Sequence, residues 1–286
     1  MTVATALTLV VVTFNLLHGG PWSEWTGDDG HLERRFEIVA SELERLKPDV
    51  VALQEASVGW RRGHVARRLA ERLGLHHAHT AATERIFGFR PLGWLATGLI
   101  GFSEGPAILS RFPIVATETI DLPRCRKRFD PRVILAATLR TPRGDLVAYS
   151  THVSRDDCQL ARIAEIIGAR RNGLPSLVMG DFNAVENSDA MEGFRAAGFL
   201  DAFRVANPSA VGATVWQPIE VSTPTATRRV DYILILPGHR ADVRVPASRV
   251  VLDRPGRKAD GATLWPSDHH GVLAAITITP RASAAR

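Results

Sequence analysis

The chain has 286 residues, of which 45% are hydrophobic, and a formal net charge of +5 at pH 7. This length and hydrophobic content fit one large domain that buries its own core. The two cysteines, Cys125 and Cys158, could pair, but they exclude a disulfide framework and do not reveal the compartment. The charge comes almost entirely from arginine and suits any phosphate-bearing partner or an anionic membrane surface.

The first predicted element is an apolar strand that ends on Asn15. No Lys or Arg precedes this run, so it reads as a strand and not as a secretory signal. No uninterrupted apolar stretch has the length of a membrane-spanning helix. We therefore expect a cytoplasmic protein, for which peripheral contact with a membrane stays possible.

Helical and strand periodicities then alternate along the chain. Apolar residues recur at helical spacing between 32 and 47, where Pro48 stops the helix, and again from Val65 to Leu73, where Gly74 ends it. The later elements are predicted as a strand at 76–80, a strand pair at 104–109 and 114–119, a hairpin at 133–139 and 145–152, helices at 155–171 and 188–197, and strands up to 279.

Polar side chains stand where the apolar strands begin or end. The clearest case is Gly-Asp-Phe-Asn, in which Gly180 allows a bend and Asp181 and Asn183 emerge from a buried strand. Any one such residue could be an ordinary turn, a helix cap or a core histidine. Six polar islands of this kind occur in the chain, and they contain Asn15, Glu55, His152, Asp181, Asn183, Asp231, Asp268 and His269.

The order of these residues resembles a known pattern. Asn, Gln-Glu, Thr-His, Gly-Asp-x-Asn, Asp-Tyr and Ser-Asp-His follow one another as in the endonuclease/exonuclease/phosphatase superfamily, over about residues 10–272. The resemblance implies an α+β fold, a four-layer αββα sandwich in which two packed, mostly antiparallel sheets are flanked by helices. It also implies one catalytic domain over residues 1–280, and we expect residues 281–286 to form a disordered tail.

The resemblance further implies an enzyme that hydrolyses phosphodiester, or else phosphomonoester, bonds by in-line attack of water. Oxygen ligands favour Mg²⁺ or Mn²⁺ over zinc. By resemblance, Glu55 is the principal metal ligand, with Asn15 beside it and Asp268 near the same ion or a second one. Asp181 would activate the attacking water and Asn183 would bind the phosphate.

Histidines complete the expected site. By resemblance, Asp231 holds His269 in the correct tautomer, and both His269 and His152 contact the phosphate. His152 is typical of the deoxyribonuclease-like and sphingomyelinase-like branches, in which a glutamate lies close to it, and Glu104 fits that role. His18 and His270 are expected to be neighbours without a catalytic role.

Two segments bear on the substrate. Residues 86–102 are strongly apolar and glycine-broken, and they form either a loop that touches lipid beside the site or a hairpin buried over the core. Basic residues between 124 and 132 either hold phosphates or lie on a solvated loop. A phosphodiesterase for a lipid head group or small amphiphile uses both segments and ranks first. A DNA or RNA nuclease is the alternative, and a non-catalytic binding protein is third. No obligate protein partner is implied.

Overall fold

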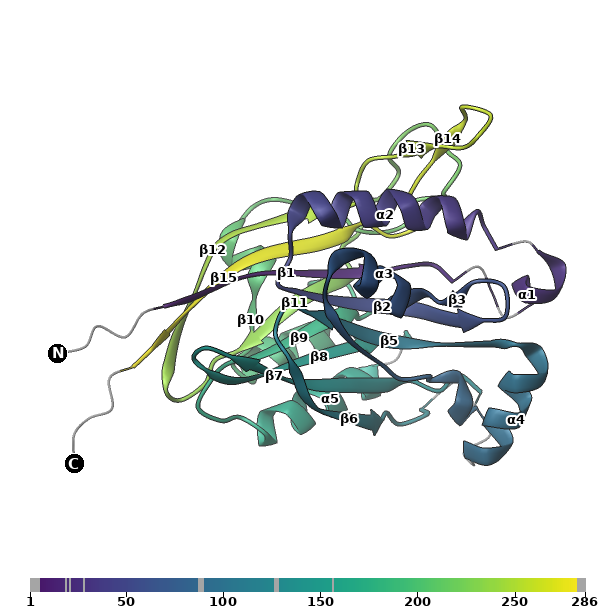
Figure 1. Cartoon of the computed structure of the whole chain (residues 1–286). Helices are drawn as coiled ribbons and strands as arrows, with labels where there is room; N and C mark the ends of the chain where they lie inside the picture. Colours follow the sequence, from purple (N-terminus) through teal and green to yellow (C-terminus); the bar gives the residue numbers. More distant parts are fainter. Residues whose placement is uncertain are drawn as a thin grey trace.

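The computed structural model describes residues 6–18, 20, 22–27, 29–86, 90–125, 129–155 and 157–281. Two sheets pack face to face, with helices on their outer faces (Figure 1). The strand order is β12-β15-β1-β2-β5-β4 in a seven-stranded sheet, where β3 pairs with β2, and β10-β11-β9-β8-β7-β6 in a six-stranded sheet. The expected four-layer sandwich is confirmed.

The seven-stranded sheet contains β1 (Leu7–Asn15), β2 (Val50–Gly59), β3 (Gly63–His64), β4 (His76–His79), β5 (Phe102–Ser110), β12 (Ala241–Val251) and β15 (Gly271–Pro280). Its β1 and β2 run parallel, with Asn15 opposite Gln54. Because parallel strands end at the same edge of a sheet, this register sets Asn15 next to Glu55.

The six-stranded sheet contains β6 (Ile114–Asp121), β7 (Val133–Thr141), β8 (Gly144–His152), β9 (Ser176–Asp181), β10 (Leu200–Asp201) and β11 (Asp231–Leu236). Strands β8 and β9 are parallel and pair His152 with Asp181. Strand β11 runs antiparallel to β9 and begins at Asp231, directly opposite Asp181. Three polar side chains therefore meet at one edge. A small separate sheet joins β13 (Gly256–Arg257) and β14 (Thr263–Leu264).

Helices cover both outer faces. Helices α2 (Leu32–Leu46) and α3 (Val65–Leu73) pack on the seven-stranded sheet, and α5 (Asp157–Ala169) and α6 (Asp189–Ala196) on the six-stranded sheet. The helices predicted from periodicity are thus confirmed. The remaining short helices are α1 (Ser23–Thr26), the 3₁₀-helix η1 (Thr83–Arg85), α4 (Arg90–Ile100) and α7 (Ala202–Ala206).

Alternating side chains divide the core into three layers. In β1, Val11 points into the core between the sheets and Val12 packs under the helices. Leu135 and Met179 meet Val11 in the inter-sheet core from the other sheet. This packing fixes the relative position of the two sheets whose edges carry the polar residues.

The strands predicted at 104–109 and 114–119 are present, but the prediction that they pair is wrong. Strand β5 belongs to the seven-stranded sheet and β6 to the six-stranded sheet, where β6 pairs with β7. The connection between them carries the chain across the sandwich, and Phe112 within it is buried in the inter-sheet core. A tight turn between paired strands and a connection between two sheets have similar sequences. Here Phe112 is buried between the sheets, which shows that the connection passes from one sheet to the other.

Residues 86–102 form neither the expected loop nor the expected buried hairpin, because most of the segment is a helix, and its contact with lipid stays a prediction. Helix α4 exposes Trp94 (67%) and Leu99 (68%), so it is neither an irregular loop nor buried over the core. Residues 87–89 lie outside the described residues, as do 126–128 of the basic segment and 282–286 of the expected tail.

Cys125 and Cys158 form a disulfide that links the segment after β6 to α5. Within the described part of the chain, none of the helices is long and apolar enough to span a bilayer.

Candidate active site

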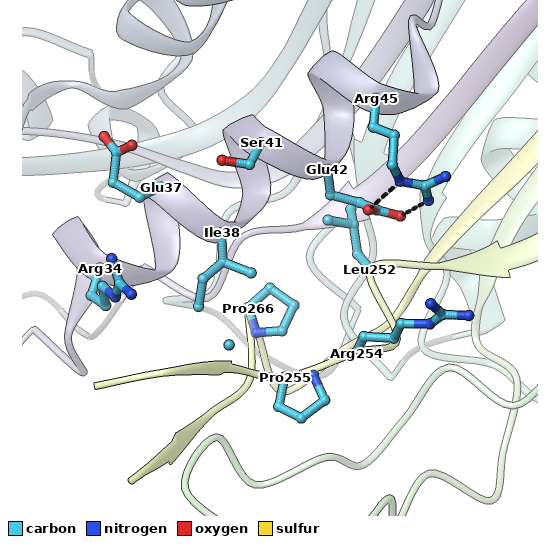
Figure 2. A pocket seen from close by; sticks show the side chains of 11 residues that line it. Arg34, Glu37, Ile38, Ser41, Glu42, Arg45, Leu252, Arg254, Pro255 and Pro266 are labelled. Atoms are coloured by element: carbon cyan, nitrogen blue, oxygen red, sulfur yellow. Dashed lines mark hydrogen bonds and ion pairs between the residues drawn. The ribbon is translucent and has the colours of Figure 1, made fainter. Parts of the chain in front are cut away.

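Six of the eight predicted polar residues line one pocket of about 300 Å³, and Asn15 and Asp231 contact members of this set. The pocket is lined by side chains from both sheets, among them Glu55, His152, Asp181, Asn183, Asp268 and His269. A larger pocket of about 500 Å³ lies between α2 and the segment around Pro255 (Figure 2). Glu42 and Arg45 on its wall bind each other, 2.6 Å apart, and the residues expected for the chemistry lie elsewhere.

Glu55 is held at the end of the paired β1 and β2. The register between β2 and β5 shifts from Leu53 to Ala56, and Glu55 in this bulge has a left-handed backbone with φ of 54°. Asn15 Nδ2 donates to Glu55 Oε1 over 3.2 Å, and the His18 amide donates to Oε2 over 3.1 Å. Burial opposes ionisation, but the charge of His18 and these hydrogen bonds outweigh it and lower the pKa of Glu55.

His18 therefore has a closer place in the site than expected. Its Nε2 lies 3.3 Å from Glu55 Oε2, and its ring contacts Phe102 with 5.2 Å between ring centroids. A single histidine near an acidic residue carries little signal in sequence, and only the left-handed turn at Leu17, with φ of 53°, brings the two together. His270 instead stacks on the buried Trp265.

Asp181 lies at the centre of the site. A Cβ on Gly180 would lie 2.0 Å from the Thr151 carbonyl oxygen of β8, so only glycine allows β9 to approach this closely. Asp181 Oδ2 accepts from Asn15 Nδ2 over 3.2 Å, and Oδ1 accepts from the Asn183 amide over 2.9 Å. Burial, followed by the charge of Asp231, raises the pKa of Asp181 to about 7. A carboxylate with this pKa can accept a proton from water near neutral pH.

Asp231 and His269 form a buried pair. His269 Nδ1 lies 2.9 Å from Asp231 Oδ2, and His269 Nε2 lies 3.7 Å from Asp181 Oδ2. Burial lowers the pKa of His269, but Asp231 outweighs it and raises the pKa to about 10. His269 is therefore an imidazolium at neutral pH, and its Nε2–H can donate to an anionic oxygen.

His152 contacts two carboxylates of the site. Its Nε2 lies 3.3 Å from both Asp181 Oδ2 and Asn183 Nδ2, and its Nδ1 lies 3.8 Å from Glu55 Oε1. Glu104 is half-buried at the start of β5, and burial raises its pKa, with the Glu55 charge adding to that rise. Its pairing with His152 stays a prediction.

The donor set fits a hard divalent cation. Asp268 is 7% exposed, and burial and the charge of Glu55 both raise its pKa. A cation between such carboxylates would relieve this repulsion, and oxygen ligands suit Mg²⁺. Asp181, Asp231 and His269 also bring possible ligand atoms within 4.8 Å of one another. Because a ligating imidazole must lose its proton, we consider Glu55 and Asp268 the better metal ligands and the Asp–Asp–His group the acid–base part.

The sequence analysis missed Arg35, which is 1% exposed. Its guanidinium donates to main-chain carbonyls of Leu16 (2.6 Å), Leu17 (2.6 Å), Gly30 (2.7 Å) and Pro266 (3.2 Å). Arg35 thereby ties the loop after Asn15 to the loop before Asp268. The signal was present, because Arg35 interrupts the apolar face of α2 next to Phe36.

The mouth of the pocket is basic and aromatic. Arg132, Arg155 and Arg228 line it together with Trp216, whose side chain is 54% exposed. Arg132 Nε lies 3.0 Å from Asp130, whereas Arg155 and Arg228 are exposed and have no charged partner among the described residues. Of these, only Arg132 belongs to the basic segment noted in the sequence.

Comparisons with known proteins agree with this geometry. The model of the endonuclease/exonuclease/phosphatase family matches residues 12–269. No curated protein matches the chain. A mannosyl-6-phosphatase from Bacteroides thetaiotaomicron VPI-5482 superposes with a TM-score of 0.69 at 19% identity, covering 94% of this chain and 99% of that one. The catalytic domain of human nocturnin with bound sulfate superposes with a TM-score of 0.66 at 19% identity, covering 96% and 97%. A family protein from Leptotrichia buccalis C-1013-b has a TM-score of 0.66 at 21% identity, with coverage of 94% and 99%.

Proposed function

Since the chain belongs to the endonuclease/exonuclease/phosphatase family, we propose that it is a phosphoesterase that hydrolyses phosphodiester bonds with Mg²⁺ or Mn²⁺. The observation that carries the proposal is the contact of Asn15 with both Glu55 and Asp181, over 3.2 Å each. This contact joins a carboxylate suited to a metal with a carboxylate suited to a base. It does so between strands of different sheets.

Each residue has a distinct task in this proposal. Glu55 and Asp268 would hold the metal, which would neutralise charge on the phosphate when bound. Asp181 takes the proton of the attacking water, and its pKa of about 7 lets it accept that proton at neutral pH. His269, kept as an imidazolium by Asp231, donates to a phosphate oxygen whose charge grows in the transition state.

Asn183 and His152 orient the reaction. The Asn183 amide fixes Asp181 Oδ1, while its Nδ2 donates to the Val153 carbonyl over 2.9 Å. This leaves Asn183 rigid beside His152, where both can contact the phosphate. In the proposal His152 gives its proton to the leaving oxygen, and the phosphate keeps the oxygen that came from water.

The substrate proposed first is a phosphodiester that carries a lipid or another small apolar group. Helix α4 supports this, because it leaves Trp94 and Leu99 exposed next to β5. A nuclease is the second candidate. The exposed Arg155 and Arg228 at the mouth favour it, since they suit a second backbone phosphate, and Trp216 offers a ring for base stacking.

One screen tests both candidates. Hydrolysis of bis-p-nitrophenyl phosphate, sphingomyelin vesicles, phosphoinositides, DNA and RNA is measured with Mg²⁺, with Mn²⁺ and after chelation. We expect metal-dependent turnover of the soluble diester and a preference for the lipid substrates, with Asp181→Asn as the inactive control. Turnover that survives chelation contradicts the metal requirement, and exclusive hydrolysis of DNA or RNA replaces the lipid substrate with the nuclease.

A further inference from the structure

We propose that one end of the molecule docks on the interface of a lipid bilayer and presents the pocket to it. This inference rests on the proposed function, since it supplies that reaction with a membrane-borne substrate. The surface, here called the tryptophan face, combines α1, the turn between β2 and β3, and α4 (Figure 1). Its members are Trp22, Trp25, Trp60, Trp94, Leu95 and Leu99.

The exposure of these side chains is unusual. Trp22, Trp25, Trp60 and Trp94 are 62%, 61%, 63% and 67% exposed, although the whole chain has only six tryptophans. Leu95 and Leu99 add 53% and 68% exposed side chains on α4. Soluble proteins rarely gather so many large apolar groups on one face without a partner.

Hydrogen bonds and a ring contact join the three segments into one surface. Trp25 Nε1 donates to the Ile100 carbonyl over 2.9 Å, and the Trp25 and Trp60 rings lie 5.8 Å apart. The Trp60 amide donates to the Gly101 carbonyl over 3.3 Å. A Cβ on Gly101 would lie 2.3 Å from the Trp60 ring, so the glycine permits this approach.

A buried ion pair holds α1 in place. Glu24 and Arg62 bind each other with side chains only 1% and 3% exposed, and Glu24 also accepts from the Arg61 amide over 2.6 Å. A helix of four residues is not stable by itself, and burying two charges is costly. The fold therefore keeps Trp22 and Trp25 exposed to solvent by means of an energetically costly buried ion pair. This is expected if the exposed tryptophans have a function.

Helix α4 is likewise fixed. A Cβ on Gly93 would lie 1.8 Å from the Glu84 carbonyl oxygen of η1, so α4 rests directly on that short helix. Its next residue, Trp94, is turned to solvent. The tryptophan face is thus a preformed surface, which loses little conformational entropy when it binds.

A short series of contacts connects the face to the proposed metal site. Arg62 Nη1 donates to the His18 carbonyl over 2.5 Å, and His18 Nε2 lies 3.3 Å from Glu55. The His18 ring also contacts Phe102, which directly follows Gly101. The start of β1 and the end of β15 lie at the opposite end of the molecule (Figure 1).

Charge and side-chain type favour a bilayer over a protein partner. Residues 91–100 contain no charged residue, and tryptophan prefers the boundary between head groups and acyl chains. Arg61 lies exposed next to Trp60, and Arg155 and Arg228 are exposed at the pocket mouth. These cations complement anionic head groups around an apolar centre.

Vesicle binding tests the proposal without any turnover. Wild type and Trp94→Ser/Leu95→Ser/Leu99→Ser are sedimented with phosphatidylcholine vesicles, with and without phosphatidylserine. We expect wild type to bind, more tightly with phosphatidylserine, and the triple variant to bind at least about tenfold more weakly. Val211→Ser, at a side chain that is 71% exposed outside the face, is the matched control and should bind as wild type does.

A second measurement uses unmodified protein. Lipids brominated near the head group should quench the tryptophan fluorescence of wild type, which requires no variant to fold. Absence of both quenching and sedimentation overturns the proposal, as does equal binding by the triple variant. If wild type forms dimers that the triple variant does not, and stays off vesicles, the face is a protein interface and the proposal is wrong.

The outcome is separable from that of the proposed function. Hydrolysis of soluble bis-p-nitrophenyl phosphate should be equal in wild type and the triple variant. If wild type binds vesicles but hydrolyses no phosphodiester, the reaction is wrong and the docking surface stands. If it hydrolyses the soluble diester without binding vesicles, the docking surface is wrong and the reaction stands.

Discussion

Replacing Arg35 by methionine should destabilise the fold and weaken metal binding together. The variant keeps the length of the side chain but leaves the carbonyls of Leu16 and Pro266 buried without their donor. Each unsatisfied buried group costs about 1–3 kcal/mol, and removal of the buried charge returns part of that sum. We therefore expect the free energy of unfolding to fall by about 3 kcal/mol.

Urea denaturation followed by circular dichroism measures this loss, and calorimetry measures Mg²⁺ affinity below the transition. Because Leu16 follows Asn15 and Pro266 precedes Asp268 by two residues, we expect Mg²⁺ to bind about tenfold more weakly. Arg34→Met, an exposed neighbour on α2, is the control and should change stability by less than about 0.5 kcal/mol. A loss below about 1 kcal/mol with unchanged Mg²⁺ affinity for Arg35→Met would refute this reasoning.

Three further predictions concern charged groups. Glu55→Gln should abolish metal-dependent hydrolysis and Mg²⁺ binding with an unchanged melting temperature; retained turnover in saturating Mg²⁺ would sink the ligand assignment. Asp181→Asn and His269→Ala should each lower kcat by about 10²–10⁴-fold with smaller changes in KM, and an effect on KM alone would contradict their roles. Hydrogen bonds from Arg204, and further ones from Arg229, lower the pKa of Glu186 to about 2. The stability from this pairing is therefore full above the unfolded pKa near 4.5 and is lost as pH falls towards 2. The stability difference between wild type and Glu186→Gln should shrink between pH 7 and pH 3, and a constant difference would exclude the linkage.

Apolar spacing and helix-stopping residues in the local sequence were enough to predict the helices. The helices at 32–46 and 65–73 follow from apolar spacing and from the residues that stop them, Pro48 and Gly74. That β5 and β6 lie in different sheets could not be predicted in this way. Membership of a sheet is decided by contacts far apart in the chain, and here by the burial of Phe112 between the sheets.

The candidate site shows the same division. Polar residues at strand ends marked it, because such residues contribute little to an apolar core. The partners that position them were missed: the signal for Arg35 was its place on the apolar face of α2, and His18 reaches Glu55 only through a left-handed turn. Only part of the tryptophan face could be anticipated from the sequence. Residues 86–102 stood out because they are strongly apolar, whereas the segments around Trp22, Trp25 and Trp60 gave no such signal.

The division of the site between the two sheets makes catalysis sensitive to shear. Asn15 connects the two sheets with a hydrogen bond of 3.2 Å to Asp181, so sliding one sheet by a fraction of that length would separate the proposed metal ligand from the proposed base. Packing at Leu135 and Met179, which lie in the layer between the sheets, sets this alignment. Substitutions in that layer are therefore expected to change the reaction rate without altering the pocket residues. Pressure and temperature should act in the same way, because they also affect how the two sheets are aligned.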